Sequence, residues 1–144
     1  MKAKCILSFF LLFTMLAFGQ ADRRDQIKAI KSSRIAAALS LTSLESQKFW
    51  PLYLNWEEKT YDAENKIQQL LSKLGDKNVD ALSPKEAQLY LTQIENDQEE
   101  ISNLRRKLVS DLKPVIGVKK ILKLKIAEDD FNKLLVKKIK GKKD

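Results

Sequence analysis

A stripe of mainly apolar residues between Phe49 and Leu74 constrains the fold of this chain more than any other sequence feature. Successive members lie four and three residues apart in turn, which is the spacing of one face of an α-helix in a bundle or short coiled coil. The stripe begins with aromatic residues and continues with mainly aliphatic ones, which predicts a bulky end to a helical core. Its members are Phe49, Tyr53, Trp56, Thr60, Ala63, Ile67, Leu70 and Leu74.

Two predicted helices begin with the same capping device. Thr42 and Glu45 have the spacing of a capping box, in which each side chain accepts a hydrogen bond from the other residue's backbone N–H. Ser83 and Glu86 repeat this spacing, and Pro84 takes the first helical position, where a missing N–H does no harm. The repeat covers the residue pairs Leu41 and Leu82, Thr42 and Ser83, Glu45 and Glu86, Gln47 and Gln88, and Phe49 and Tyr90.

The periodicity predicts four helices, and no stretch alternates as a strand would. The first helix is expected over residues 22–39 and the second over residues 42–74, with Gly75 as a left-handed cap. The third is expected to begin after Ser83 and to finish before Pro114, and the fourth to follow from about residue 118 after a break. The fold class is therefore all-α, a four-helix hairpin or bundle.

Pro51 falls well inside the second predicted helix. Proline has no backbone N–H, and its ring clashes with the preceding turn of a straight helix. We therefore expect the second helix to be kinked near Pro51, or to be a short helix followed at once by a long one.

Residues 1–19 have the pattern of a signal peptide. A basic start precedes an apolar run that is shorter than a membrane-spanning helix requires, and small residues follow it. Cleavage is predicted after Gly19 or after Ala21, and the alternative is an uncleaved membrane anchor. We expect residues 20–144 to form a single exported, periplasmic domain with no transmembrane segment, whose basic tail (137–144) frays.

Composition excludes several classes of chemistry. The chain has no histidine, and its one cysteine, Cys5, lies in the predicted signal peptide. The exported part therefore has no thiol nucleophile, no disulfide, no Ser-His-Asp triad and no imidazole ligand for a metal. Paired carboxylates such as Glu57-Glu58 are better explained as solvated helix faces than as acid–base pairs or cation sites. We expect no enzymatic activity, no cofactor and no metal site.

The basic balance of the chain, with a formal charge of +8, predicts an anionic partner. Export argues against nucleic acid, so the expected partners are a protein and, through weak contacts, an anionic membrane surface. Trp50 lies beside the apolar stripe, and Arg23 and Arg24 belong to a basic helix face. We take these three residues as candidate anchors for a protein partner; the alternatives are core packing for the aromatic group and a solvated face for the arginines.

The chain carries a resemblance over most of its length beyond residue 22. LTSLESQKFWPLYLNWE (41–57) resembles a family of small exported bacterial proteins described as sensors of ECF-type sigma factors. The runs RRDQIKAIKSSRIAAALSLT (23–42) and DLKPVIGVKKILKLKIAEDDFNKLL (111–135) resemble the same family. The hallmark residues, whose roles are mainly structural, are Leu41, Thr42, Glu45, Gln47, Phe49, Trp50, Pro51, Tyr53, Trp56, Leu82, Ser83, Glu86, Gln88, Tyr90, Glu128 and Phe131.

The resemblance implies a non-enzymatic sensor or regulator in envelope stress signalling that acts by binding another protein. More distantly, the doubled LT/LS-x-x-E-x-Q start is similar to the Spy/CpxP periplasmic stress proteins, which are helical hairpins that dimerise into a cradle. That similarity implies the alternative function, a holdase chaperone that binds unfolded clients, and it implies a homodimer. The related metal-sensing branch uses histidines, and this chain has none.

Overall fold

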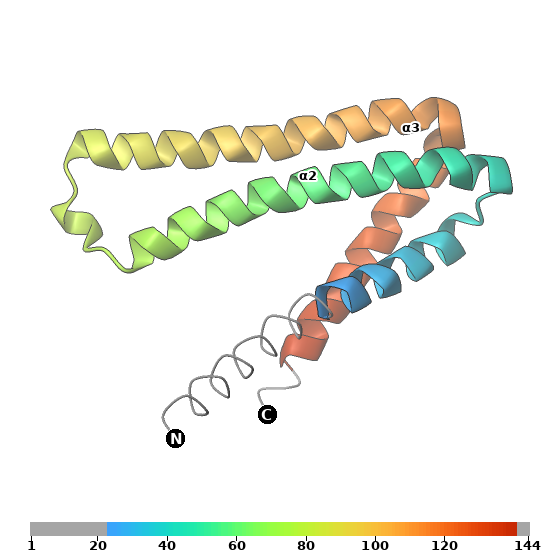
Figure 1. Ribbon diagram of the computed structural model, residues 1–144, viewed down its shortest axis with the longest axis horizontal. Coiled ribbons are helices and arrows are strands. Elements are labelled where there is room, and N and C mark those ends of the chain that lie inside the picture. The colour runs from blue at the N-terminus through green and yellow to red at the C-terminus, as the bar shows by residue number, and fades with distance from the viewer. Residues whose placement is uncertain (1–22, 141–144) are drawn as a thin grey trace, which may run out of the picture. The chain divides into compact units, whose positions relative to one another are not determined.

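The computed structural model of the protein describes residues 23–140. The predicted signal peptide with its two cleavage points, and residues 141–144 of the tail, lie outside the described residues. Within them, every regular element is a helix, which confirms the all-α prediction. In chain order the elements are a helix over residues 23–39, α2 (Ser43–Gly75), the short 3-10 helix η1 (Val79–Ala81) and α3 (Pro84–Lys140), as Figure 1 shows.

The chain divides into two compact units. The hairpin unit comprises residues 41–121, which contain α2, η1 and the first part of α3. Among the described residues, the terminal unit comprises 23–40 and 122–140. The prediction of one domain over residues 20–144 stays a prediction.

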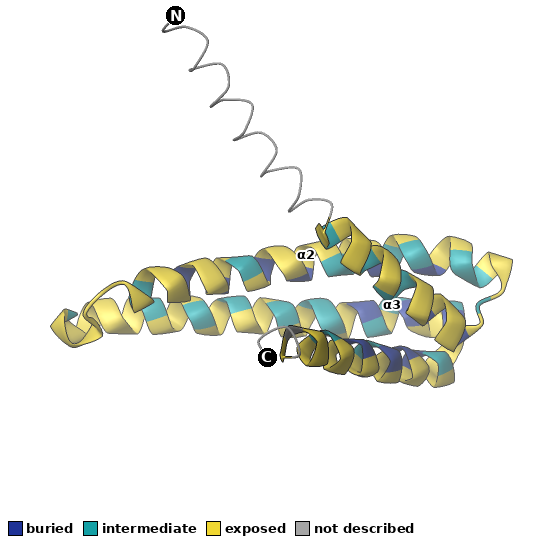
Figure 2. Cartoon of the chain, turned by 90° about the horizontal axis from the view of Figure 1, so that it is seen from below, coloured by how far each residue is buried: buried dark blue, intermediate teal, exposed yellow. Residues whose placement is uncertain are grey.

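In the hairpin unit, α2 and the first part of α3 run antiparallel and side by side in both views of the chain (Figures 1 and 2). Near the connecting loop, the Lys77 Nζ lies 3.2 Å from the Tyr90 hydroxyl. At the other end of the hairpin, the Lys120 Nζ lies 2.6 Å from a carboxylate oxygen of Glu45. Between these ends, the Lys66 ammonium of α2 lies 4.0 Å from a carboxylate oxygen of Glu100, and the Arg105 guanidinium carbon lies 5.1 Å from the Trp56 ring centroid, so the two helices face each other over this stretch.

The predicted stripe is the buried face of α2. Six of its eight members are buried, and Trp56 and Leu74 are half-buried. On the first part of α3, Tyr90, Ile94, Ile101 and Leu104 are only half-buried, since two helices alone leave the edges of their seam accessible. Burial on this part of α3 is confined to the end far from the loop, at Leu108, Leu112, Ile116 and Ile121.

Two predictions about α2 are wrong, one about a break at Pro51 and one about the cap at Gly75. The helix passes through Pro51 without interruption, so the predicted division into a short and a long helix is wrong. One proline removes a single hydrogen bond, and the packed stripe on both sides of it holds the helix together. A kink near Pro51 without a break stays a prediction. Gly75 is the last residue of α2 and has no positive φ, so its predicted left-handed cap is also wrong; Asp76 ends the helix in right-handed geometry.

The predicted break before the fourth helix lies at Gly117, and Pro114 lies inside the helix that precedes it. The expected end before Pro114 is therefore wrong by about one turn. Gly117 has φ 73° and ψ 163°, a region that is essentially restricted to glycine. α3 thus consists of two helical segments joined at this residue.

The terminal unit has its own buried set. Ile35 and Leu39 are fully buried on the helix over residues 23–39, which ends where Ser40 adopts φ 45° and donates its N–H to the Ala36 carbonyl at 3.1 Å. The second part of α3 contributes three buried residues spaced three and four apart, Leu124, Ala127 and Phe131.

Candidate functional site

An aromatic cluster occupies the early turns of α2. It consists of Phe49, Trp50, Tyr53 and Trp56. Tyr53 lies three or four residues from each of the other three, which brings their rings to its side of the helix. Phe49 and Tyr53 are fully buried, whereas Trp50 and Trp56 are half-buried. The cluster is thus both a part of the core and a partly accessible surface.

The rings of the cluster contact one another in sequence. Phe49 and Tyr53 stack with ring centroids 5.3 Å apart and planes 14° apart. The Trp50 indole meets both of them edge-on, at 4.9 Å from Phe49 and 6.1 Å from Tyr53. Offset stacks and edge-to-face pairs are the favourable arrangements for aromatic rings. The orientation of Trp50 is therefore set by two rings that are themselves buried.

Trp56 closes the cluster against α3. Its ring lies 5.3 Å from that of Tyr53, and the guanidinium carbon of Arg105 lies 5.1 Å from the Trp56 ring centroid. A guanidinium over an indole face is a favourable cation–π contact. Sequence reasoning missed Arg105, because the residue that α3 places opposite Trp56 depends on the register of the hairpin.

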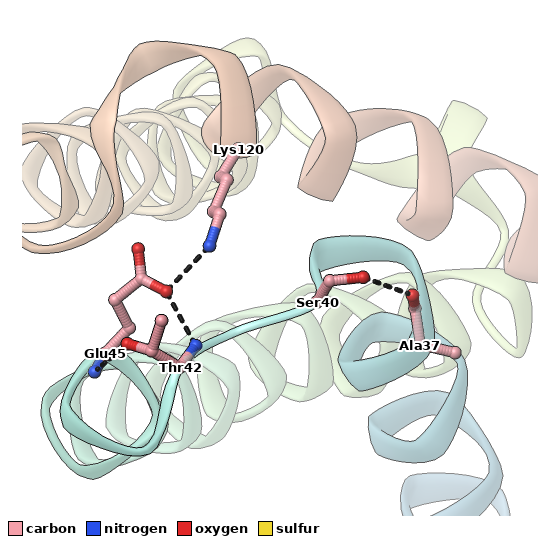
Figure 3. Close-up of polar contacts among 5 residues, drawn as sticks. All are labelled: Ala37, Ser40, Thr42, Glu45 and Lys120. Carbon is pink, nitrogen blue, oxygen red and sulfur yellow. Dashed lines mark hydrogen bonds and ion pairs between the residues drawn. The ribbon is translucent and has the colours of Figure 1, made fainter.

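Just before the cluster, the first capping box is joined by a lysine from α3 (Figure 3). Glu45 accepts a hydrogen bond from the Thr42 backbone N–H at 2.7 Å, and Glu45 donates its own N–H to the Thr42 hydroxyl at 3.2 Å. The same Glu45 oxygen accepts from the Lys120 Nζ at 2.6 Å. The Lys120 ammonium, and then the Thr42 N–H, lower the pKa of Glu45. Lys120 is a second residue that sequence reasoning missed.

The second capping box is also formed as predicted. The Ser83 hydroxyl and backbone N–H both donate to Glu86, at 2.7 and 2.9 Å, and the Glu86 N–H donates to the Ser83 hydroxyl. The hydroxyl donor, followed by the N–H, lowers the pKa of Glu86. Gln88 donates to the Thr92 hydroxyl at 3.1 Å, a contact within α3. The contacts between Ser83 and Glu86 cap the start of α3.

The three candidate anchors are divided between the units. Trp50 belongs to the hairpin unit, whereas Arg23, which is exposed, and Arg24, which is half-buried, belong to the terminal unit. They do not form one cluster within a unit. The other hallmark residues are also spread out: Gln47 and Pro51 are exposed, Leu41, Leu82, Tyr90 and Glu128 are half-buried, and Phe131 is buried.

An open groove runs along α3 of the hairpin unit and is lined by Asn96, Glu99, Glu100, Asn103, Leu104 and Lys107. One of its two carboxylates, that of Glu100, lies 4.0 Å from the Lys66 ammonium. Within residues 23–140, no group of three or more potential ligand residues is placed to hold a metal ion. Over the same residues, no helix has the length and apolar character to cross a membrane.

Comparison of the chain with protein-family models, with curated proteins and with solved structures found no match. The resemblances to the sigma-factor sensors and to Spy/CpxP proteins therefore stay predictions from the sequence.

Proposed function

We propose that this protein is a non-enzymatic regulator or sensor in envelope stress signalling of the ECF sigma factor type. It is exported to the periplasm and acts by binding another protein. The proposal rests on the resemblance of residues 41–57 and 111–135 to the sensor family, and on one structural observation, the setting of Trp50.

Trp50 has the properties of a preorganised anchor. Its indole is half-buried, so part of its surface is accessible to a partner. Edge-on contacts with Phe49 and Tyr53, both fully buried, hold its orientation. A large aromatic side chain that is already immobilised loses little entropy on binding, and such residues commonly dominate specific protein interfaces.

The second candidate function is a holdase that binds unfolded clients. One observation favours it: fourteen large apolar side chains are exposed among the described residues, distributed over both units. Dispersed apolar surface on a basic protein favours the binding of unfolded clients of many sequences, through charge attraction together with scattered apolar contacts. A homodimer of the cradle type belongs to this second proposal.

Replacement of Trp50 separates the two functions. We expect the wild-type chain to capture a discrete envelope protein from extracts and Trp50→Ala to weaken that binding by about 30-fold or more, the effect of losing one interface hot spot. Leu71→Ala is the matched control, because Leu71 is exposed on the same helix far from the aromatic cluster. Circular dichroism and thermal unfolding verify that both variants fold.

The arginines are tested in the same capture assay with Arg23→Gln and Arg24→Gln. Suppression of aggregation is measured in parallel with several unrelated unfolded clients. Efficient suppression of all of them, together with no discrete partner captured, would contradict the regulator proposal and favour the holdase. Capture that is unchanged in Trp50→Ala would remove Trp50 from the proposed interface.

A further inference from the structure

The charge of the described chain is concentrated in the terminal unit. Residues 23–40 and 122–140 contain eleven Lys and Arg against four Asp and Glu, which leaves a formal charge of +7. Residues 41–121 contain twelve Lys and Arg against thirteen Asp and Glu, which leaves −1. The basic character of the protein is therefore a property of one unit.

Within the terminal unit, α3 combines positive charge with exposed aliphatic side chains. Leu122 is 64% exposed and Ile126 is 54% exposed, and they lie one turn apart. Lys123 and Lys125 are exposed between them, and neither forms an ion pair with a described residue. We define these four residues as the basic patch.

No acidic residue lies inside the patch or within ten positions before it. Residues 112–127 contain five lysines and no Asp or Glu. The acidic residues 128–130 follow directly and end the patch, and Asp129 is held in an ion pair with Lys133 at 2.5 Å. A field of one sign together with exposed apolar surface favours an anionic occupant that also offers an apolar phase.

We propose that the basic patch docks on the surface of a lipid bilayer that contains anionic lipids. The Leu122 and Ile126 side chains enter the boundary between head groups and acyl chains, while Lys123 and Lys125 reach the lipid phosphates through their flexible stems. The docking is peripheral and reversible, because only one turn of helix carries it.

The composition of the patch favours lipid over an acidic protein surface. Specific protein interfaces are enriched in Trp, Tyr and Arg and depleted in Lys. The basic patch contains no aromatic residue and no arginine, only Lys and branched aliphatic side chains. Helices that lie on anionic membranes carry Lys or Arg on the polar face and Trp, Phe or Leu on the apolar face, so a patch of lysines and exposed aliphatic side chains fits such a surface.

The first test measures co-sedimentation of the full chain with vesicles of phosphatidylcholine, alone or mixed with phosphatidylglycerol. We expect tighter binding to the anionic vesicles, and Lys123→Gln/Lys125→Gln to weaken it by about 30-fold, from the usual contribution of two lysines near such a surface. Lys59→Gln/Lys85→Gln removes two exposed lysines of the hairpin unit and should leave binding unchanged.

The second test concerns the apolar part of the patch. Leu122→Ser/Ile126→Ser should weaken binding to anionic vesicles by about tenfold or more, because apolar contact with the bilayer is lost. The control is Leu44→Ser/Leu89→Ser, since both leucines are 63% exposed in the hairpin unit. All variants share the apolar run near the N-terminus, so its contribution cancels in each comparison, and circular dichroism confirms their folding.

Equal binding to neutral and anionic vesicles would overturn the proposal, as would patch variants that behave like their controls. Binding of the chain to immobilised polyglutamate is measured with the same variants. Loss of polyglutamate binding in the patch variants, with vesicle binding unchanged, would assign the patch to an acidic protein and overturn the lipid proposal.

Discussion

Replacement of Gly117 by alanine tests whether the break in α3 is imposed by the folded protein. Gly117 has φ 73° and ψ 163°, which an L-residue with a Cβ rarely adopts. A Cβ built on Gly117 would meet no atom within 4 Å, so steric contact with the surroundings adds nothing to the cost. The whole effect of Gly117→Ala therefore comes from the backbone.

The expected cost is about 1–3 kcal/mol of the free energy of unfolding, the usual range for a residue held in a sparsely populated backbone region. Gly75→Ala is a matched control. A Cβ at Gly75 also meets nothing within 4 Å, but Gly75 ends α2 without a positive φ. Its replacement should stabilise the protein by roughly 0.5 kcal/mol, because alanine has fewer conformations to lose on folding. The two variants should thus shift stability in opposite directions.

Urea denaturation followed by circular dichroism measures both changes, and thermal unfolding gives a second estimate of roughly 3–5 °C per kcal/mol for a chain of this size. A Gly117→Ala variant as stable as Gly75→Ala would refute the reasoning. So would a gain in helical signal without loss of stability, because the two segments of α3 would then have joined into one helix at no cost.

Three further results are expected. The pKa of Glu45 is lowered from 4.5 by Lys120 and by the Thr42 N–H. Its ionised form therefore stabilises the fold above about pH 4.5, and this stabilisation is lost as the pH falls through the lowered pKa. Glu45→Gln should reduce the loss of stability at acidic pH, measured by urea denaturation at several pH values. Leu112→Ala should cost about 2–5 kcal/mol because Leu112 is fully buried, whereas Leu44→Ala should change stability by less than about 0.5 kcal/mol, and a similar loss in both would contradict the assigned core. Zinc or copper should leave the Tm unchanged, since the chain has no histidine, and a sub-micromolar site found by calorimetry would disprove this expectation.

Features that depend on a few neighbouring residues could be predicted from the sequence. Both capping boxes, at Thr42 and at Ser83, are formed because each involves residues only three apart. The buried face of α2 follows from its spacing, since helical periodicity alone decides which residues share a face. The break in α3 could be predicted approximately, because Gly117 and the nearby Pro114 are local signals for the end of a helix.

Features set by tertiary packing could not be predicted. Pro51 and Pro114 each predicted a helix break, but both lie inside helices, because packing outweighs the loss of one hydrogen bond. The contacts of Arg105 with Trp56 and of Lys120 with Glu45 depend on the hairpin register, which no short pattern encodes. The sequence left open whether Trp50 packs in the core or is accessible at the surface. In the structure it does both, because its ring packs against buried rings and remains partly exposed.

The two donors to the Glu45 carboxylate have a consequence for folding kinetics. Thr42 is three residues away along the chain, whereas Lys120 is 75 residues away. The entropy of loop closure rises with the length of the loop, so the bond to Thr42 can form with the first turn of α2, and the bond to Lys120 must await the pairing of the two long helices. Interactions that form late act mainly on the unfolding rate. The Glu45 carboxylate therefore contributes to an early step of folding, the start of α2, through Thr42. Through Lys120 it contributes to a late step, and this second contact slows the unfolding of the hairpin.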